Sequence, residues 1–321
     1  MNKNWIGPLV SCALIGLLYF LLKDQFPAIV SALKNGNHGL IGLAALIFLS
    51  TTVILARRLQ LIFDAEDVKI KLRETLSLTY IGYFFNNFLP TSVGGDIVKA
   101  MCASKVTGQR IKSITTVMMD RIFGLFTFIL IPSFSMLLLK DKIDPRVPVM
   151  VYSFLTFSII FFFLLFNRSI AKRFHIIENV FNKIGIGTKI RQIYDGMHNF
   201  RNHKAVVIQA MVLSMIGQSI GIFCLYMLAV AIGADKGVWM YFFLLVPIVH
   251  LISMLPSING LGIREGAYIY FLKSYIGTEK AAAIGILWLG LTILVSVIGG
   301  FVYFIRRDYH IEFKNAKQEI A

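Results

Sequence analysis

The chain has 321 residues, of which 57% are hydrophobic, 13% aromatic and 15% charged, and its formal net charge at pH 7 is +15. A soluble domain of this length has too little interior to bury so much apolar surface, so the composition predicts an all-α, polytopic membrane protein. The positive charge does not require a nucleic acid, because an anionic inner leaflet attracts basic loops and no segment combines basic and aromatic residues as nucleic-acid binders do.

Six stretches are apolar and long enough to cross about 30 Å of hydrocarbon as helices. They are residues 5–22, 38–56, 122–139, 147–166, 205–234 and 281–305. The alternative for the first stretch is a cleaved signal peptide. The stretch 5–22 lacks an A-x-A type cleavage site and several apolar segments follow it, so we expect it to be retained as the first span. The whole chain, residues 1–321, is then one membrane domain.

Two other apolar stretches, residues 75–98 and 237–272, are interrupted by Pro, Gly, Asn and charged residues. Unpaired backbone groups are unfavourable in hydrocarbon, so broken backbone at membrane depth must face protein or a wet cavity. We predict that each stretch forms two half-helices that meet at a Leu-Pro-[Thr/Ser] turn, a re-entrant hairpin that enters and leaves on one side. Two short complete spans in each stretch are the alternative.

The distribution of Lys and Arg orients the chain. With the N-terminus inside, 22 of the 32 Lys and Arg fall in segments predicted to be cytoplasmic and 8 in segments predicted to be outside. The positive-inside rule therefore predicts a cell-membrane protein with both termini in the cytoplasm. The cytoplasmic segments are residue 3 and its surroundings, 56–74, 99–112, 167–204 and the residues after 305.

Residues 167–204 combine eight basic residues with apolar residues at helical spacing. This pattern is typical of an amphipathic helix on an anionic leaflet. A docking surface for a lipid-modifying enzyme is the alternative interpretation.

One phrase occurs twice in the chain, once in each interrupted stretch. The copies are Leu89-Pro90-Thr91-Ser92-Val93-Gly94-Gly95-Asp96-Ile97 and Leu255-Pro256-Ser257-Ile258-Asn259-Gly260-Leu261-Gly262-Ile263. An odd number of spans precedes the second half, so we predict two inverted repeats, residues 1–146 and 147–310, followed by a cytoplasmic tail at 311–321. Paired broken helices of this kind mark the substrate site of transporters that work by alternating access.

The repeated phrases hold candidate anion-binding groups. Glycines at a helix start free backbone N–H groups to meet an anion, and the helix dipole favours negative charge there. The planar guanidinium of Arg264 suits a phosphate, and Lys99, one turn after Asp96, adds a second cation. The candidate substrate-binding residues are Pro90, Thr91, Gly94, Gly95, Asp96, Lys99, Asp120, Arg121, Asn259, Gly260, Gly262, Arg264 and Glu265.

Each charged candidate also has a structural interpretation. Asp96, Arg264 and Glu265 would in that case neutralise one another and hold the hairpins together. The pair Asp120-Arg121 either lies at the cytoplasmic interface or turns inward toward Asp96 and Arg264.

The phrases at 90–96 and 260–267, together with Asp120-Arg121, resemble the lysylphosphatidylglycerol synthase transmembrane family. The resemblance covers nearly the whole chain. It implies a flippase-like protein that moves a phospholipid, an aminoacyl-phospholipid or a polyprenyl-phosphate-linked lipid between leaflets. Where the family pattern commonly has Arg three residues after Gly-Gly-Asp, this chain has Lys99, which keeps the charge but not the bidentate geometry.

The bifunctional relatives transfer lysine with a separate soluble domain that this sequence lacks, so we expect no enzymatic activity. The alternative is an integral-membrane transferase or accessory subunit acting on a lipid-linked substrate, with Asp96 or Glu265 as general base.

No cofactor or metal is expected, because the three Cys are isolated, the six His are scattered and no Walker-type loop occurs. His250 lies in a broken segment, where we expect a packed or capping role. The expected partners are membrane lipids with anionic head groups. The Gly-x-x-x-Gly spacing of Gly217 and Gly221 permits close helix approach and leaves a homodimer open.

Overall fold

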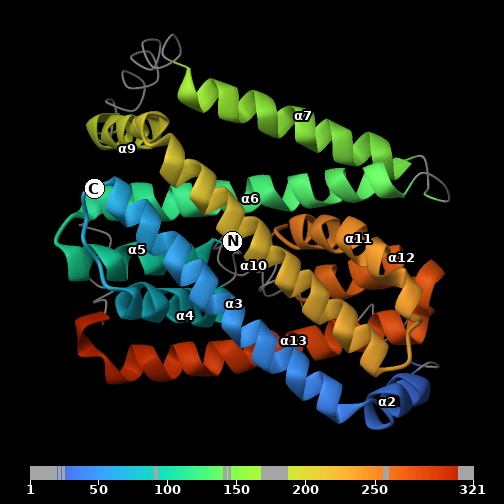
Figure 1. Ribbon diagram of the computed structural model, residues 1–321. Coiled ribbons are helices and arrows are strands. Elements are labelled where there is room, and N and C mark those ends of the chain that lie inside the picture. Colours follow the sequence, from blue (N-terminus) through green and yellow to red (C-terminus); the bar gives the residue numbers. More distant parts are fainter. Residues whose placement is uncertain are drawn as a thin grey trace.

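The computed structural model describes residues 20, 23, 26–89, 93–139, 143, 146–167, 187–255 and 260–309. This part of the chain contains eleven α-helices and no strand, which confirms the all-α prediction (Figure 1). The helices are α2 (Phe26–Lys34), α3 (His38–Ala65), α4 (Leu72–Phe88), α5 (Gly94–Thr107), α6 (Arg110–Leu138), α7 (Arg146–Phe166), α9 (Gly187–Asn199), α10 (Lys204–Ala231), α11 (Trp239–Ile252), α12 (Ile263–Ile276) and α13 (Thr278–Ile305). Three short 3₁₀ helices are η3 (Phe200–Asn202), η4 (Lys236–Val238) and η5 (Arg307–Tyr309).

Five helices are long and apolar enough to cross a membrane, namely α3, α6, α7, α10 and α13. They confirm five of the six predicted spans, and the predicted span 5–22 lies, apart from Phe20, outside the described residues. Two of the helices extend well beyond the predicted apolar stretches. Helix α3 continues beyond residue 56 to Ala65, and α6 begins at Arg110 rather than at 122. Both extensions carry charged residues that pair inside the protein, as described below.

Local signals explain several helix ends. The side chain of Asn37 accepts a hydrogen bond from the Leu40 amide (3.0 Å) and so caps α3. Helix α5 ends at Gly108, whose φ of +68° lies in the left-handed region that glycine adopts without strain. The predicted cytoplasmic segment 56–74 contains the last residues of α3 and the first residues of α4. The connection between the two helices therefore comprises only residues 66–71.

Each interrupted stretch forms two helices, α4 with α5 and α11 with α12. None of the four reaches the about 20 residues that cross a bilayer. In Figure 1, α4 begins and α5 ends at one end of the bundle, whereas α11 begins and α12 ends at the opposite end. The two helix pairs therefore approach the middle of the bundle from opposite directions.

Side-chain contacts tie the chain together at each end of the bundle. At the end where α13 finishes, Arg306 Nη1 donates to Ser77 Oγ of α4 (3.2 Å). At the other end, Lys280 Nζ of α13 donates to the carbonyl of Gly233, just after α10 (2.5 Å). The described parts of the segments predicted to be cytoplasmic lie at one end of the bundle, and those of the predicted external segments lie at the other (Figure 1).

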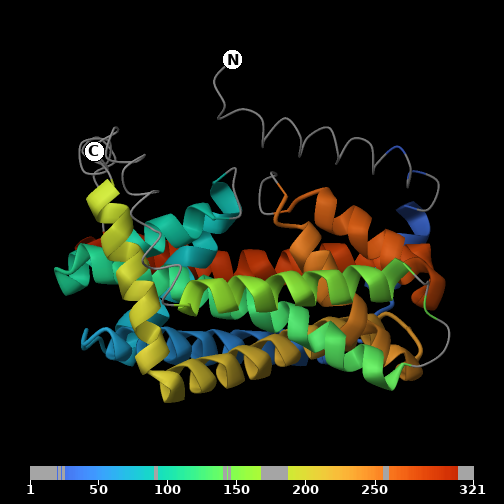
Figure 2. The ribbon, with the colours of Figure 1, turned by 90° about the horizontal axis from the view of Figure 1, so that it is seen from above.

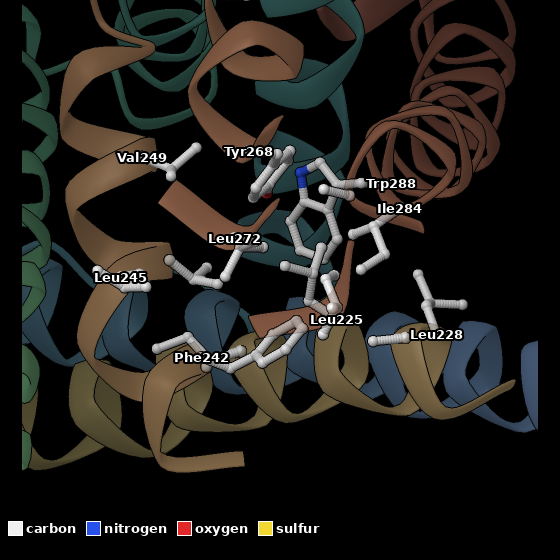
Figure 3. Packing of buried hydrophobic residues seen from close by; sticks show 14 of the residues in the cluster. Leu225, Leu228, Phe242, Leu245, Val249, Tyr268, Leu272, Ile284 and Trp288 are labelled. Atoms are coloured by element: carbon white, nitrogen blue, oxygen red, sulfur yellow. The ribbon is translucent and has the colours of Figure 1, made fainter. Parts of the chain in front are cut away.

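The largest apolar core lies between α10, α11, α12 and α13. Figure 3 shows Leu225, Leu228, Phe242, Leu245, Val249, Tyr268, Leu272, Ile284 and Trp288 packed against one another. Lipid tails are as apolar as these side chains, so close packing contributes more than burial from water. Small residues allow the closest approach. At Gly299 of α13, a Cβ atom would overlap the carbonyl group of Tyr80 on α4.

Helix α9 covers part of the predicted amphipathic segment 167–204, and residues 168–186 lie outside the described part. Its apolar side chains Ile193 and Met197, with Phe200 of η3, pack in a cluster that includes Phe123 of α6. The apolar face of α9 therefore contacts the helix bundle.

Candidate functional site

A cavity of about 340 Å³ lies where the two broken stretches meet the long helices. Figure 2 shows α4 and α5 facing α11 and α12 across the middle of the molecule. The polar residues that line the cavity are Thr51, Arg58, Thr79, Tyr83, Asn86, Asp96, Lys99, Asp120, Arg121, Gln218, His250, Ser253, Arg264 and Thr292. The other lining residues are Phe48, Leu55, Leu125, Phe128, Ile222, Met254 and Trp288, with the glycines at 82, 124, 217 and 221.

The wall of this cavity is positively charged. Four of the described lining residues are cations and two are carboxylates, and a third carboxylate outside the lining, Glu265, pairs with Arg264, which leaves an excess of one positive charge. The charged residues are Arg58, Lys99, Arg121, Arg264, Asp96 and Asp120. Ionisable groups at membrane depth are unfavourable unless they are paired or serve a ligand.

The deeper part of the charge network is centred on Asp120 of α6. Its Oδ1 accepts from Arg58 Nε (2.7 Å) and lies 2.7 Å from Arg58 Nη2, and its Oδ2 accepts from Lys99 Nζ (3.1 Å). Arg58 Nη1 also donates to Ser214 Oγ (2.7 Å). The side chains of Arg58, Asp120 and Lys99 are at most 10% exposed. This network joins α3, α5, α6 and α10, so it holds the wall of the cavity in place.

The outer part of the network is centred on Asp96 of α5. Asp96 Oδ2 accepts from Arg121 Nη1 (2.7 Å), and Asp96 Oδ1 lies 3.2 Å from Lys99 Nζ. Its side chain is 15% exposed and that of Arg121 is 27% exposed, the highest value in the network. Arg121 is therefore the least buried cation of this network. Asp120 and Arg121 both line the cavity, and Arg121 contacts Asp96, one of the two residues toward which the inward alternative turns it.

The second broken stretch contributes Arg264, which is buried and lines the cavity. Its Nη2 and Nε donate to Glu265 Oε1 (2.9 and 3.1 Å). Glu265 Oε2 accepts from the amide of Gly262 (2.7 Å) and so caps α12. Asp96 and Glu265 are each the third residue of their helix. Arg264 thus pairs with Glu265 on the same helix, whereas Asp96 of α5 pairs with Lys99 of α5 and with Arg121 of α6.

The predicted glycines serve the packing of the half-helices. The amide of Gly95 donates to Asn86 Oδ1 (2.9 Å), and a Cβ atom at this position would overlap the carbonyl of Gly82 on α4. Gly260 and Gly262 have φ angles of +74° and +83°, which other residues rarely adopt. The amides of Gly95 and Gly262 are thus bonded within the chain.

Not every predicted residue reaches the cavity. The candidates that line it are Asp96, Lys99, Asp120, Arg121 and Arg264. The candidates that the structure describes but that do not line it are Gly94, Gly95, Gly260, Gly262 and Glu265. Pro90, Thr91 and Asn259 lie outside the described residues.

Sequence reasoning missed Arg58 and Gln218. Arg58 was counted with a basic loop, although Thr51, Leu55 and Arg58 repeat at the spacing of one helix face and all three line the cavity. Gln218 follows Ser214 by four residues in an otherwise apolar helix, which places both polar side chains on one face.

His250 has the packed position that we predicted. Its Nε2 lies 3.0 Å from Tyr268 Oη, and its ring packs between Trp288 and the edge of Phe128. In the described part of the chain, no group of three His, Cys, Asp or Glu could hold a metal ion.

The two glycines of the Gly-x-x-x-Gly pattern have different surroundings. A Cβ atom on Gly217 would be 3.5 Å from the side chain of Leu55, so this glycine packs against α3 of the same chain. Both glycines line the cavity, but a Cβ atom on Gly221 would have no neighbour within 4 Å.

Comparison with known proteins gives one match. Residues 4–300 match the protein family described as the lysylphosphatidylglycerol synthase TM region. No curated protein and no solved structure matches the chain.

Proposed function

The chain belongs to the lysylphosphatidylglycerol synthase transmembrane family, and from this membership we propose that it moves a lipid with a phosphate-bearing head group between the leaflets of the cell membrane. The observation that carries the proposal is the cavity between the two broken stretches, whose cations outnumber the carboxylates paired with them by one. A phosphate placed there would neutralise charge that the chain itself leaves unbalanced.

The charge network suggests how the head group binds. The phosphate takes the place of Asp96 at Arg121, the most exposed cation of the network, and Lys99 supports it from the same helix turn. The buried pair of Arg58 and Asp120 stays intact and holds Lys99 in position. The lipid tails remain in the membrane, outside the cavity.

The arrangement of the broken stretches suggests how the lipid crosses. We infer that α4–α5 and α11–α12 are re-entrant hairpins of two inverted repeats, the first entering from the cytoplasmic side and the second from outside. Their entry from opposite ends of the bundle and the acidic third residue of α5 and α12 support this inference. Rocking of the two repeats about the cavity would then open it to each side in turn.

The same inference places both termini in the cytoplasm. It is tested with a reporter inserted in the connection 66–71, between α3 and α4. A reporter there should be inaccessible from outside the cell. If this connection were labelled from outside the cell, the chain would have the opposite orientation to the one that we infer.

The test of the proposed function is reconstitution of the purified protein into vesicles that contain a fluorescent phospholipid in both leaflets. An impermeant quencher added outside reports movement of the inner-leaflet lipid, and mass spectrometry of the recovered lipid reports covalent change. We expect movement without covalent change, and loss of movement in Arg121→Gln. Arg57→Gln is the matched control, because Arg57 is exposed and its Nη1 donates to Gln60 on the same helix. A new lipid product without movement would support the transferase alternative instead.

A further inference from the structure

Helix α4 presents a polar face to the cavity. The residues of α4 that line the cavity recur at the spacing of one helix face, and they are Thr79, Gly82, Tyr83 and Asn86. Thr79 Oγ1 donates to the carbonyl of Thr75 within the helix (2.8 Å). Tyr83 and Asn86, by contrast, each carry a hydrogen-bond donor that the described part of the chain does not use.

The amide of Asn86 has a fixed orientation with its donor side unused. Asn86 Oδ1 accepts from the backbone amide of Gly95 on α5 (2.9 Å). A backbone N–H group can only donate, so the oxygen must face Gly95, and Nδ2 lies on the other side of the amide group. No described residue accepts from Nδ2. This atom is not among the buried side-chain atoms that lack a partner, so it keeps accessible surface.

The hydroxyl group of Tyr83 is also unused. It makes no hydrogen bond with the described residues, and it is not among the buried atoms that lack a partner, so it too keeps accessible surface. The phenol interacts electrostatically with the cations Lys99 and Arg58 and with the carboxylates Asp120 and Asp96. The hydroxyl therefore lies close to the charge network of the cavity.

Helices α4 and α5 lie against each other at this point. A Cβ atom on Gly82 would be 3.6 Å from Lys99 Cδ, so the side chain of Lys99 crosses the cavity face of α4. Gly95, which is bonded to Asn86, immediately precedes Asp96. The two unused donors therefore lie on the side of the cavity that Asp96 and Lys99 occupy.

An ionised phosphate group offers strong acceptor oxygens, and neutral donors bind them without adding charge at membrane depth. We propose that Tyr83 Oη and Asn86 Nδ2 are binding groups, which donate to the phosphate oxygens of the same head group that Arg121 and Lys99 hold. The inference rests on the proposed function, and it assigns α4 to the phosphate site.

The variant Tyr83→Phe removes the hydroxyl group and leaves the ring. Binding to the detergent-solubilised full chain is measured by native mass spectrometry, with phosphatidylglycerol as the phosphodiester lipid and geranylgeranyl phosphate as the phosphomonoester lipid. We expect the unaltered protein to bind at least one of the two. Tyr83→Phe should bind that lipid about tenfold more weakly, as for the loss of one hydrogen bond to a charged group. The lipid that binds identifies the class of phosphate.

The matched control is Tyr80→Phe on the same helix. Tyr80 does not line the cavity, and its Oη accepts from Thr52 Oγ1 (3.0 Å). Tyr80→Phe should lower the Tm of the lipid-free protein and leave the lipid affinity within about twofold, because it loses an internal hydrogen bond. Tyr83→Phe should do the reverse, because its hydroxyl has no internal partner to lose. A lowered Tm with unchanged affinity in Tyr83→Phe would show a structural role and overturn the inference.

The variant Asn86→Asp tests the second donor. It keeps an oxygen for the amide of Gly95 and places a carboxylate oxygen where Nδ2 was. Because this oxygen accepts instead of donating and repels the phosphate, we expect the same lipid to bind more than tenfold more weakly. Unchanged affinity in either variant, or binding of neither lipid to the unaltered protein, would overturn the inference.

These binding measurements need no movement of lipid. A protein that shows the loss of affinity in both variants but moves no lipid would keep the role of α4 and contradict the proposed function. A protein that moves lipid while both variants keep their affinity would do the reverse.

Discussion

The substitution Arg58→Gln tests whether the buried ion pair holds the cavity wall together. Arg58 donates to Asp120 and to Ser214, and both it and Asp120 are buried. Gln at this position leaves Asp120 with Lys99 as its cationic partner. Removing one member of a buried ion pair destabilises a protein by about 3–5 kcal/mol, and the remaining contact with Lys99 favours the lower end, about 3 kcal/mol.

This loss of folding free energy should lower the Tm by a measurable amount. A change of 1 kcal/mol shifts the Tm of a large domain by about 2–4 °C, so we expect Arg58→Gln to lower the Tm by roughly 6 °C or more. The assay is thermal unfolding of the detergent-solubilised protein. The control is Arg57→Gln, the same substitution one residue earlier. Because Arg57 is exposed and exposed pairs contribute little, its Tm should change by less than about 2 °C. Equal shifts in the two variants would refute the structural role assigned to Arg58.

Two further substitutions test the packing and the ionisation of the described chain. Gly299→Ala should destabilise by about 1–3 kcal/mol, because a Cβ atom would overlap the Tyr80 carbonyl. Gly290→Ala, exposed on the same helix, should not lower the Tm and should raise it by up to about 4 °C, because Ala is the better helix former. Burial raises the pKa of the Glu66 carboxyl above 4.5, and the charge of Lys112 opposes this only in part. The native state therefore binds this proton more tightly than the unfolded state, so the contribution of Glu66 to stability falls as the pH rises from 4.5 through the raised pKa. Glu66→Gln should raise the Tm at pH 8 and have a smaller effect near pH 5, and an equal effect at both values would contradict the assignment.

The spans could be predicted because hydropathy is a local property of the sequence. A run of apolar residues identifies a helix that crosses the membrane whatever its neighbours are, and five predicted spans have counterparts in the structure. The broken helices were likewise visible, since Pro and Gly interrupt a helix locally. Whether these helices are re-entrant remains a prediction.

The ends of the spans depend on pairing, which is not local. The first turns of α6 were excluded from the predicted span because they hold Arg110, Lys112, Asp120 and Arg121. Asp120 is accommodated there because Arg58, which lies on a different helix, neutralises it. A charge count along the chain cannot reveal such a partner.

The site could also be predicted only in part, because its contacts join residues on different helices. Asp96, Lys99 and Arg121 were predicted from charges at membrane depth, and the structure brings them together in one network. Gln218 could not be predicted because a single uncharged amide does not distinguish one apolar helix from another in the sequence. Only its position beside Gly124, on another helix, shows that one of its atoms is left unpaired.

The most direct test of the proposed function fills the cavity without altering any charge. Gly221 lines the cavity and a Cβ atom there would meet nothing within 4 Å, so we expect the side chain of Gly221→Leu to extend into the cavity. Gly290→Leu places the same side chain on an exposed face of α13, again with no neighbour within 4 Å. In the vesicle assay, the account predicts that Gly221→Leu moves lipid no faster than protein-free vesicles, while Gly290→Leu matches the unaltered protein. Movement at the unaltered rate in Gly221→Leu would contradict the claim that the head group crosses through this cavity.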